Sequence, residues 1–348
     1  MRFDGGLGIK AVTTWIPETY ETIDDAVSAG LIDADNVGRQ GVTALPVCHE
    51  DIAPPQMAVL AGRKALARAG WRPDHVGMLA HAWVYHQGHD KWSPAHYIAS
   101  ELGLPGSALP FGIQAMCTGG GTGLYLAAIQ LVADPRVPGA LVTTAERYGA
   151  PVWDRWQMHP DIGYGDGATA LLLHHRDGTP DELVLLSMTH SSAGWLEGME
   201  RGDAPFTRSP MEGKTNWVTN DLRKQFYDRH GKESFPGESR KHVRISLHEA
   251  LADAELEADD PRIRFVAVPR MGPRLVDLMY LNVIESDLKA EHVLLGGRTG
   301  HLGSGDSIAN MADVVEKNML APGEIAIIAG AGGGFGWSTA IVQAPEES

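Results

Sequence analysis

The sequence predicts an α/β fold made of two related halves, and three features of the chain support this. Short apolar runs of strand length alternate with helical patterns along the whole chain. Each half contains a helix that leads through a charged turn, RPDHV or ADDPRI, into a buried strand. Each half also closes with a glycine-rich turn before an apolar strand, YGDGATALLLHH in the first and GAGGGFGWSTAIVQ in the second. This weak repeat of elements divides the chain into halves 1–178 and 179–348.

The apolar runs also predict where the individual elements lie. One helix is expected over Pro55–Gly70, which Gly70 stops, and another over Lys241–Leu256, where the apolar residues keep helical spacing. Between 191 and 240 the chain is polar and rich in glycine, proline and charges, which predicts a connecting segment or cap over the fold. Buried strands are expected at 77–84, 140–145, 168–174, 183–189, 264–268, 292–295, 325–329 and 338–342.

The composition argues against several classes of function. Apolar residues make up 43% of the 348 and charged residues 21%, as in a globular protein. The 29 Lys and Arg against 44 Asp and Glu give a net charge of −15, which predicts no nucleic-acid partner. The start, MRFDGGLGIKAV, lacks a signal-peptide pattern, and no apolar run reaches bilayer length. We therefore expect a cytoplasmic protein without a membrane partner, and the two cysteines build no disulfide framework.

The strongest signal for chemistry is FGIQAMCTGGGTGLYLAAIQLVA, which contains Cys117. The cysteine follows an apolar run and precedes a helix expected from about Gly121 to Ala133. At a helix start, the macrodipole and backbone N–H groups stabilise a thiolate, which can attack a carbonyl and hold the acyl group as a thioester. Gly119–Gly121 are expected to leave space for a thioester substrate. The alternative, a buried structural cysteine, stays open for Cys117 and is our expectation for Cys48.

Three motifs in this order, AMCTGGGTG, YGDGATALLL and GAGGGFGWS, resemble β-ketoacyl-acyl-carrier-protein synthase III and its relatives. The resemblance covers most of the chain and is weakest over 191–240. It implies the thiolase fold, with two pseudo-repeated halves packed as αβαβα layers, a homodimer, and Cys117 as the acylated nucleophile. It also implies an oxyanion hole formed by the backbone N–H groups of Cys117 and Gly333. A tight turn between the last two strands explains the same glycine run, and both interpretations can hold.

The chain departs from this family at the residues expected to carry out carbon–carbon condensation. In the family that the chain resembles, condensation uses a Cys–His–Asn arrangement. The histidine lies in a P-H-Q-A-N type motif and the asparagine in a G-N-T motif. Here VPRMGPR puts Arg270 at the place of the histidine, and GGRTGHLGSGDSIANMAD puts His301 where the asparagine would lie. An arginine cannot act as a base there, but its fixed charge could pair with the carboxylate of a malonyl donor.

His301 and Asp306 together suggest a different chemistry. Asp306 lies five residues after His301, near the start of a helix expected over Ser307–Asn318. Its carboxylate could fix the tautomer of the imidazole, so that Cys117 is the nucleophile, His301 the general base and Asp306 the residue that orients it. The alternative is that Asp306 caps the helix and His301 fills the space of the asparagine.

This set resembles a branch of synthase-III-like proteins in polyketide and antibiotic pathways that transfer acyl groups, malonyl included, to hydroxyls. We therefore expect an acyltransferase with an acyl-CoA or acyl-carrier-protein thioester as donor and a small-molecule hydroxyl, such as a sugar hydroxyl, as acceptor. No separate cofactor and no metal are expected. Two alternatives stay open: a condensing enzyme of a specialised pathway, and a non-catalytic partner subunit.

Two further segments bear on substrate binding. NVGRQGV resembles the family's R-T-G-I segment, so Arg39 could contact donor phosphate, although an ordinary ion pair explains it as well. The family often stacks a tryptophan on adenine four residues earlier, and that position is Asp35 here, so a carrier-protein donor stays open. HAWVYHQGHDKW holds His81, His86 and His89, which we expect to line the acceptor pocket or the dimer seam rather than to bind zinc.

Overall fold

The computed structural model describes residues 1–150, 152–203, 206, 208 and 219–346, and its centre is a ten-stranded sheet. The strands of the first half lie in the order β1-β7-β6-β4-β5 and those of the second in the order β8-β12-β11-β9-β10, joined where β1 pairs antiparallel with β8. If the strands of each half are numbered along the chain, both halves have the same order across the sheet: first, fifth, fourth, second, third. The strands are β1 (Arg2–Trp15), β4 (Met78–Ala82), β5 (Leu109–Ile113), β6 (Ala140–Glu146), β7 (Gly167–His175), β8 (Leu183–Ser192), β9 (Ile263–Ala267), β10 (Glu291–Val293), β11 (Ile325–Gly332) and β12 (Gly336–Gln343).

The helices repeat in the same way. Helices α2 (Pro54–Ala69) and α7 (Ser234–Asp253) each follow the first strand of a half, and α4 (Gly119–Ala133) and α10 (Asp306–Glu316) each follow the third. Between the second and third strands lie α3 (Pro94–Glu101) in one half and α8 (Pro273–Val276), a π turn and α9 (Asn282–Asp287) in the other. Gly70 ends α2 in the left-handed conformation, with φ of 64°, as predicted for a glycine stop.

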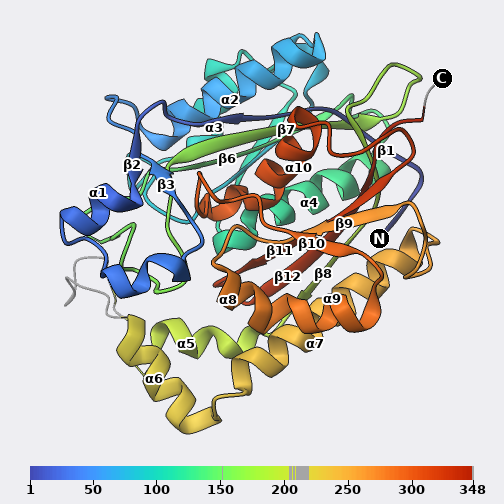
Figure 1. Cartoon of the computed structure of the whole chain (residues 1–348). Coiled ribbons are helices and arrows are strands. Elements are labelled where there is room, and N and C mark those ends of the chain that lie inside the picture. The colour runs from blue at the N-terminus through green and yellow to red at the C-terminus, as the bar shows by residue number, and fades with distance from the viewer. Residues whose placement is uncertain (151, 204–205, 207, 209–218, 347–348) are drawn as a thin grey trace.

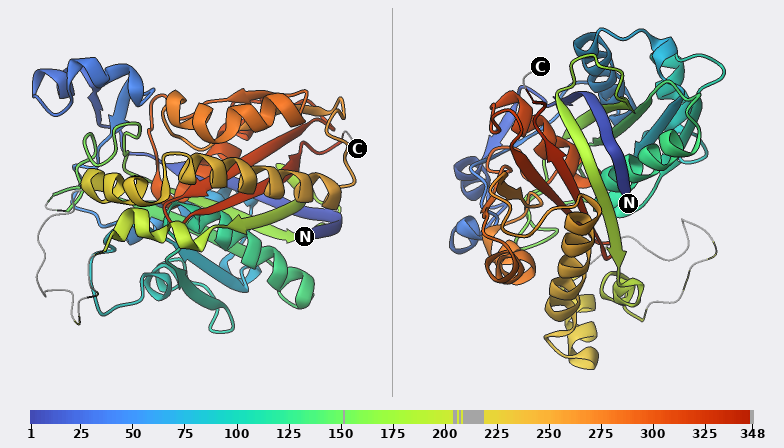
Figure 2. Two further views of the ribbon diagram at one scale, coloured as in Figure 1. Left: turned by 90° about the horizontal axis from the view of Figure 1, so that it is seen from below. Right: turned by 90° about the vertical axis from the view of Figure 1, so that its right-hand side faces the viewer.

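The helices and the sheet form five layers (Figures 1 and 2). Helices α4 and α10 lie in the middle layer, where Leu124 and Ile308 belong to one buried apolar cluster with strands of both halves. A second cluster joins α2 and α3 to the first half-sheet, and a third joins α7, α8 and α9 to the second. This is the αβαβα arrangement predicted above, and it brings the N-termini of the two central helices to the same region of the molecule.

The segment between β8 and α7 is shorter than expected. Strand β8 continues to Ser192 and α7 begins at Ser234, so both ends of the predicted cap at 191–240 belong to regular elements of the second half. Between them lie α5 (Gly198–Arg201) and α6 (Thr219–His230), while 204–205, 207 and 209–218 fall outside the described residues. The remaining small elements are β2 (Tyr20–Thr22), α1 (Ile23–Ser28) and β3 (Ala44–Pro46).

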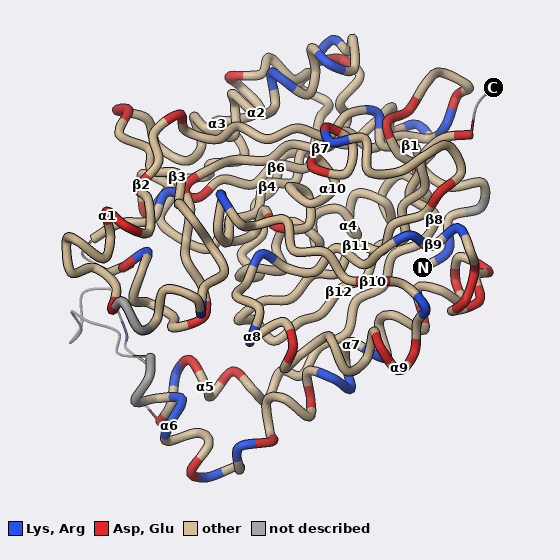
Figure 3. Tube along the Cα trace, viewed as in Figure 1, with Lys and Arg blue, Asp and Glu red and all other residues tan. Residues whose placement is uncertain are grey.

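Helix α4 is the one described segment with the length and apolar composition of a membrane span, counted over Met116–Ala133. Half of this stretch is buried, and Leu124 and Leu131 are fully enclosed between the sheet and α10. The helix carries no charged residue, whereas the outer helices α2, α6 and α7 carry many (Figure 3). Its apolar character is therefore explained by its place in the central layer.

Candidate active site

Cys117 lies in a sharp turn between β5 and α4. Met116 has a positive φ of 51°, a backbone conformation that residues other than glycine rarely adopt, and a 3-10 turn over Met116–Thr118 leads into α4 at Gly119. The Thr118 hydroxyl donates to the Ala115 carbonyl at 2.7 Å, which closes the turn. Strained backbone before a nucleophile at a helix start is a known way to expose the nucleophile to substrate, and Cys117 remains partly exposed here.

The glycines after Cys117 make room for protein rather than for substrate, contrary to our expectation. A Cβ on Gly119 would lie 2.9 Å from the Cβ of Ala82, and one on Gly120 would collide with the carbonyl oxygen of Ser304. A Cβ on Gly121 would lie 3.0 Å from the Ser338 hydroxyl. Gly119 and Gly120 therefore allow the loop before α10 to approach the start of α4, and Gly121 allows the approach of β12.

His301 and Asp306 lie together, as predicted. Nδ1 of His301 is 2.6 Å from Oδ2 of Asp306, and the two residues are only 1% and 3% exposed. The second oxygen of Asp306 accepts a hydrogen bond from the backbone N–H of Leu302 at 2.8 Å. Oδ2 also accepts from the backbone N–H of Arg270 at 2.9 Å. Asp306 is the first residue of α10, but its carboxylate binds these groups rather than capping its own helix.

The backbone of His301 is fixed by the loop before β7. Its N–H donates to the Gly163 carbonyl at 2.8 Å, and its own carbonyl accepts from the N–H of Gly165 at 3.1 Å. Gly300 has φ of 60°, and a Cβ there would collide with the Gly163 carbonyl. The motif YGDGATALLL thus contributes one side of the clamp that positions the histidine.

The pKa values of the pair follow from burial and mutual attraction. Burial alone would lower the pKa of His301, but attraction to Asp306 and then to Cys117 raises it well above its ordinary value. Burial likewise opposes ionisation of Asp306, but His301, Arg270 and the Leu302 N–H hold the pKa of Asp306 below its ordinary value. We therefore expect an imidazolium held by a carboxylate, with Cys117 on the other side of the ring.

The other ring nitrogen of His301 is free to interact with Cys117. Nε2 is buried and makes no hydrogen bond of ordinary geometry with any described residue. Cys117 is among the groups that raise the pKa of His301, so the two side chains lie close enough to interact. The residues that we predicted for catalysis are thus brought to one place, at the N-termini of the two central helices.

Asp306→Asn should move the pH dependence of acylation. The change removes the charge that raises the pKa of His301, so that burial, which lowers it, is opposed mainly by Cys117. The imidazolium is lost as pH rises through the pKa of His301, and in the variant this loss comes at lower pH. We expect the alkaline limb of the rate of thiol release from an acyl donor to shift to lower pH. Asp161→Asn, which removes a partner of Arg39, should leave the alkaline limb in place. An unchanged limb in Asp306→Asn would contradict the role of Asp306 as the residue that orients His301.

Arg270 is buried and fully engaged by protein. Its guanidinium donates to Asn310 at 2.9 Å, to Thr299 at 2.6 Å and to Asp313 at 2.6 Å, and its side chain is 3% exposed. Because all three nitrogens bind residues of α10 and the loop before it, these contacts favour a positioning role over the predicted pairing with a malonyl carboxylate.

Arg270→Ala should therefore affect acetyl and malonyl donors alike. The loss of three hydrogen bonds would loosen α10 and with it Asp306, which slows acylation whatever the acyl group. Steady-state kinetics with both thioesters would test this. A rise of KM for the malonyl donor alone would instead support the predicted carboxylate contact.

The turn between β11 and β12 approaches the nucleophile, as the predicted oxyanion hole requires. A Cβ on Gly332 would lie 2.7 Å from the Cβ of Cys117 and 2.7 Å from the N–H nitrogen of Thr118, while Gly333 lies beside Met116. Phe335 closes the turn with φ of 52°, and its N–H donates to the Gly332 carbonyl at 2.7 Å. The glycine run is thus a tight turn next to Cys117, which is compatible with donors at Cys117 and Gly333.

Arg39 is bound by residues other than those predicted for catalysis. It forms an ion pair with Asp161, with Nε 3.2 Å from Oδ1, and its third contact is Asn36 at 3.4 Å. Its side chain is 33% exposed, so the guanidinium keeps some access to solvent. The structure leaves the contact with donor phosphate as a prediction.

His81 of the histidine segment is enclosed by protein instead of lining a pocket, and the second cysteine is buried as well. His81 is fully buried between Thr143 and Gln87, and burial lowers its pKa to about 4. Burial raises the pKa of Cys48 to about 11, so that thiol stays protonated at neutral pH. Among the described residues no group of three His, Cys, Asp or Glu side chains could hold a metal ion.

Glu146, Ser304 and Tyr148 complete the site, and sequence reasoning gave none of them a role there. Glu146 is fully buried, accepts from the N–H groups of Val84 at 2.6 Å and Tyr85 at 3.1 Å, and has its pKa raised to about 8 by burial. The Ser304 hydroxyl lies 3.2 Å from the Met116 carbonyl and 3.3 Å from Glu146, so it links the two catalytic loops. Only their contacts in the folded chain reveal them.

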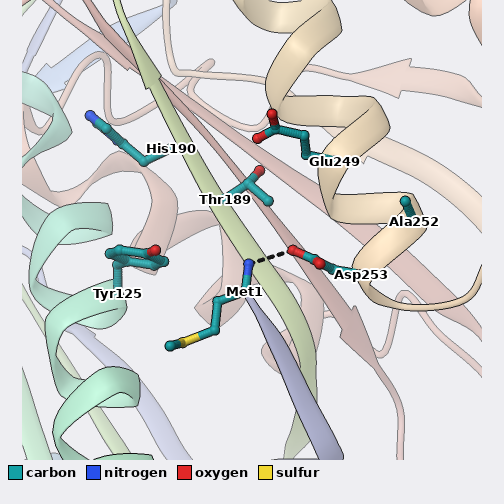
Figure 4. Close-up of a pocket in the computed structure, with 7 residues that line it drawn as sticks. All are labelled: Met1, Tyr125, Thr189, His190, Glu249, Ala252 and Asp253. Atoms are coloured by element: carbon teal, nitrogen blue, oxygen red, sulfur yellow. Dashed lines mark hydrogen bonds and ion pairs between the residues drawn. The ribbon is translucent and has the colours of Figure 1, made fainter.

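A separate cavity of about 270 Å³ lies away from these residues, beside the N-terminus (Figure 4). Tyr125, Thr189, His190 and Glu249 line it, and the amino group of Met1 pairs there with Asp253. None of the predicted catalytic residues borders it, so the chemistry assigns the active site to the loops around Cys117 instead.

Comparisons with known proteins agree with this geometry. The chain is 27% identical to a β-ketoacyl-acyl-carrier-protein synthase III of Rhizorhabdus wittichii over 92% of this chain and 94% of that one. It is 26% identical to the acetoacetyl CoA synthase NphT7 of a Streptomyces species, over 94% and 96% of the two chains. No family model matches the chain.

Solved structures show the same relationship. The acyltransferase ChlB3 superposes with a TM-score of 0.87 at 27% identity, over 98% of both chains. A 3-oxoacyl-acyl-carrier-protein synthase III from Aquifex aeolicus shares the fold, with a TM-score of 0.75 at 17% identity over 97% of this chain and all of that one. With the repeated halves and the cysteine at the start of the central helix, the chain has the thiolase fold and is similar along its length to synthase III-like proteins.

Proposed function

We propose that this protein is an acyltransferase that carries an acyl group on Cys117 and delivers it to a hydroxyl acceptor. The observation that carries the proposal is the buried His301–Asp306 pair. The second ring nitrogen of its histidine has no hydrogen-bond partner among the described residues, and the pKa of that histidine is raised by Asp306 and Cys117. A base that is oriented by a carboxylate can deprotonate an incoming alcohol. The similarity to the acyltransferase ChlB3 supports this reading.

In the first half-reaction the Cys117 thiolate attacks the carbonyl carbon of a thioester donor. The backbone N–H groups of Cys117 and Gly333 are the proposed donors to the oxyanion. The carbon–sulfur bond of the donor breaks, and the departing thiolate takes its proton from the His301 imidazolium. The imidazolium has given up its proton, and acylation removes the negative charge on Cys117, which is one of the groups that raise the pKa of His301. The ring is therefore left as a neutral imidazole that can accept a proton.

In the second half-reaction Nε2 of His301 takes the proton of the acceptor hydroxyl, whose oxygen attacks the acyl carbon. The bond from that carbon to the sulfur of Cys117 breaks, and the thiolate and the imidazolium are restored. Asp306 holds the ring in place through Nδ1 in both steps. No further cofactor takes part in this scheme, and a sugar hydroxyl is the acceptor that the resemblance suggests first.

A condensing enzyme is the second candidate, because the two sequence relatives compared above are both named synthases. Condensation from a malonyl donor proceeds by decarboxylation to an enolate. In the synthase III family that the chain resembles, neutral hydrogen-bond donors stabilise this enolate. Arg270 and His301 stand at the places of that pair here, and Arg270 is occupied by α10.

Intact-protein mass spectrometry after mixing with acetyl- and malonyl-thioesters separates these candidates. We expect one adduct on Cys117 with each donor, with the malonyl carboxylate retained, and release of the adduct by an alcohol. An adduct of acetyl mass from the malonyl donor, with release of carbon dioxide, would favour the condensing enzyme. Absence of any adduct would favour the non-catalytic subunit. Donors on CoA and on a carrier protein would be compared in the same assay.

We also propose that the protein is a homodimer whose interface covers the solvent-exposed sides of α4 and β5. Leu126 and Val132 of α4 are 37% and 50% exposed, and Leu109 on the edge strand β5 is 57% exposed. Leu126→Glu should place a charge in such an interface and shift sedimentation toward the monomer. Leu60→Glu on α2, where the leucine is 36% exposed, is the matched control and should stay dimeric. An unchanged sedimentation coefficient for Leu126→Glu would place the interface elsewhere.

A further inference from the structure

The wall beside the nucleophile is formed by aromatic residues. Tyr148 follows β6, and its ring lies 4.9 Å from the ring of Trp153 and 5.2 Å from that of Tyr164. The ring of Tyr164 lies in turn 5.6 Å from that of His301. The backbone of Tyr148 is fixed, because its N–H donates to Asp166 at 2.8 Å and its carbonyl accepts from Arg155 at 2.7 Å.

The hydroxyl of Tyr148 points into the loop that carries the catalytic pair. Gly303 has φ of 57°, and a Cβ there would collide with this hydroxyl and lie 2.7 Å from Cγ of Glu146. Ser304, the next residue, contacts the Met116 carbonyl directly before Cys117. The Tyr148 hydroxyl therefore lies against the loop of His301, one residue before the serine that contacts the turn of Cys117.

Two donors on this wall have no partner among the described residues. Tyr148 is 2% exposed, yet its hydroxyl makes no hydrogen bond, and the buried indole N–H of Trp153 makes none either. Buried donors are normally satisfied, because leaving one unpaired costs its desolvation. An alkyl chain bound here would leave both unpaired, whereas an oxygen on the bound group would satisfy them.

The surrounding charges favour an uncharged oxygen. Burial, followed by the charges of Glu146 and Cys117, raises the pKa of Tyr148 well above its ordinary value, so the hydroxyl keeps its proton and can donate. Glu146, with a pKa of about 8, is largely protonated at neutral pH, but the lowered pKa of Asp306 keeps that carboxylate charged. A carboxylate on the acyl chain would add a second negative charge here, and the nearby cations His301 and Arg270 are already paired with Asp306 and Asp313.

We propose that the acyl group taken up by Cys117 bears a neutral oxygen, a hydroxyl or a carbonyl, on its chain, and that the Tyr148 hydroxyl donates a hydrogen bond to it. The inference rests on the proposed function in that it concerns the donor of the same transfer. It makes Tyr148 a specificity-determining residue for the acyl group, with Trp153 as the second donor on the same wall.

A pair of donors that differ only in one group tests this. The coenzyme A thioesters of 3-hydroxybutyrate and isovalerate have the same shape, with a hydroxyl in one where the other has a methyl group. In the wild type we expect kcat/KM for acylation of Cys117 to favour 3-hydroxybutyryl by about fivefold, the worth of one hydrogen bond. Tyr148→Phe should bring this ratio close to one.

Tyr85→Phe is the matched control, because the hydroxyl of Tyr85 already donates to the Gly149 carbonyl at 3.2 Å. It should keep the wild-type ratio. A wild-type preference for isovaleryl, or a ratio that is the same in Tyr148→Phe and the wild type, would overturn the inference.

Binding to the Cys117→Ala protein keeps this test independent of the transfer reaction. Calorimetry with the two thioesters should show tighter binding of 3-hydroxybutyryl, and the added change Tyr148→Phe should remove the difference. If the wild type forms no adduct but this difference appears, the acyltransferase proposal fails while the inference about Tyr148 stands. Equal binding of both thioesters would overturn the inference even where acylation proceeds.

Discussion

Cys117→Ala is expected to abolish both the acyl adduct and the transfer reaction. Without the thiolate no acyl-enzyme forms, and removal of a covalent nucleophile costs about 10⁴-fold or more in rate. Intact-protein mass spectrometry would show no mass gain with any thioester, and the release of free thiol would fall to the background rate. The fold should survive, because the side chain is only partly buried in a turn held by backbone and hydroxyl contacts.

Cys48→Ala is the control for this experiment. Cys48 is 3% exposed, and burial raises the pKa of its thiol to about 11, so it supplies almost no thiolate at neutral pH. The variant should label like the wild type. If Cys117→Ala still gained an acyl group and Cys48→Ala did not, the nucleophile would have been placed on the wrong cysteine.

The elements that carry the site were predictable from sequence because glycine marks them. The runs around Cys117, Gly165 and Gly333 are conspicuous, and the repeat of a glycine turn before an apolar strand predicted the repeated halves. The fold class follows from this pattern. The reason for the glycines did not, because Gly120 faces the carbonyl of Ser304, which is far away in sequence.

Strands β1 and β5 were not predicted, and each has a physical reason. In β1 the pairs with β8 shift register between Arg2 and Leu7, where Gly5 and Gly6 both have positive φ, so the strand lacks a regular alternation. Strand β5 contains Pro110, which lacks an N–H, and such residues occur on sheet edges. A regular pattern is the signal that finds strands, and both segments interrupt it.

The role of Arg270 also could not be read from sequence. Its place in the chain predicted a substrate contact, but its partners Thr299, Asn310 and Asp313 come from a later loop and from α10. They meet only in the folded chain, where Asn310 of α10 also donates to the Val268 carbonyl just after β9. Tyr148 is a similar case, since the lack of a partner for its hydroxyl is a property of the folded chain alone.

His301→Ala is expected to separate the two half-reactions. Cys117 keeps the start of α4 and the backbone donors, so acylation slows but still proceeds. Without a base the acceptor hydroxyl is not deprotonated, and transfer should fall by about 10³-fold, within the range for loss of general base catalysis. The acyl-enzyme should therefore accumulate in the variant and persist after an acceptor alcohol is added, whereas the wild-type adduct disappears.

His190→Ala provides the comparison, because this exposed histidine of β8 lines the separate cavity beside Met1. Its adduct should turn over at the wild-type rate. Time-resolved mass spectrometry of both variants measures formation and loss of the adduct in one experiment. Rapid loss of the adduct from His301→Ala on addition of the alcohol would show that another group takes the proton. The buried pair of His301 and Asp306 would then serve only to hold the loop beside Cys117.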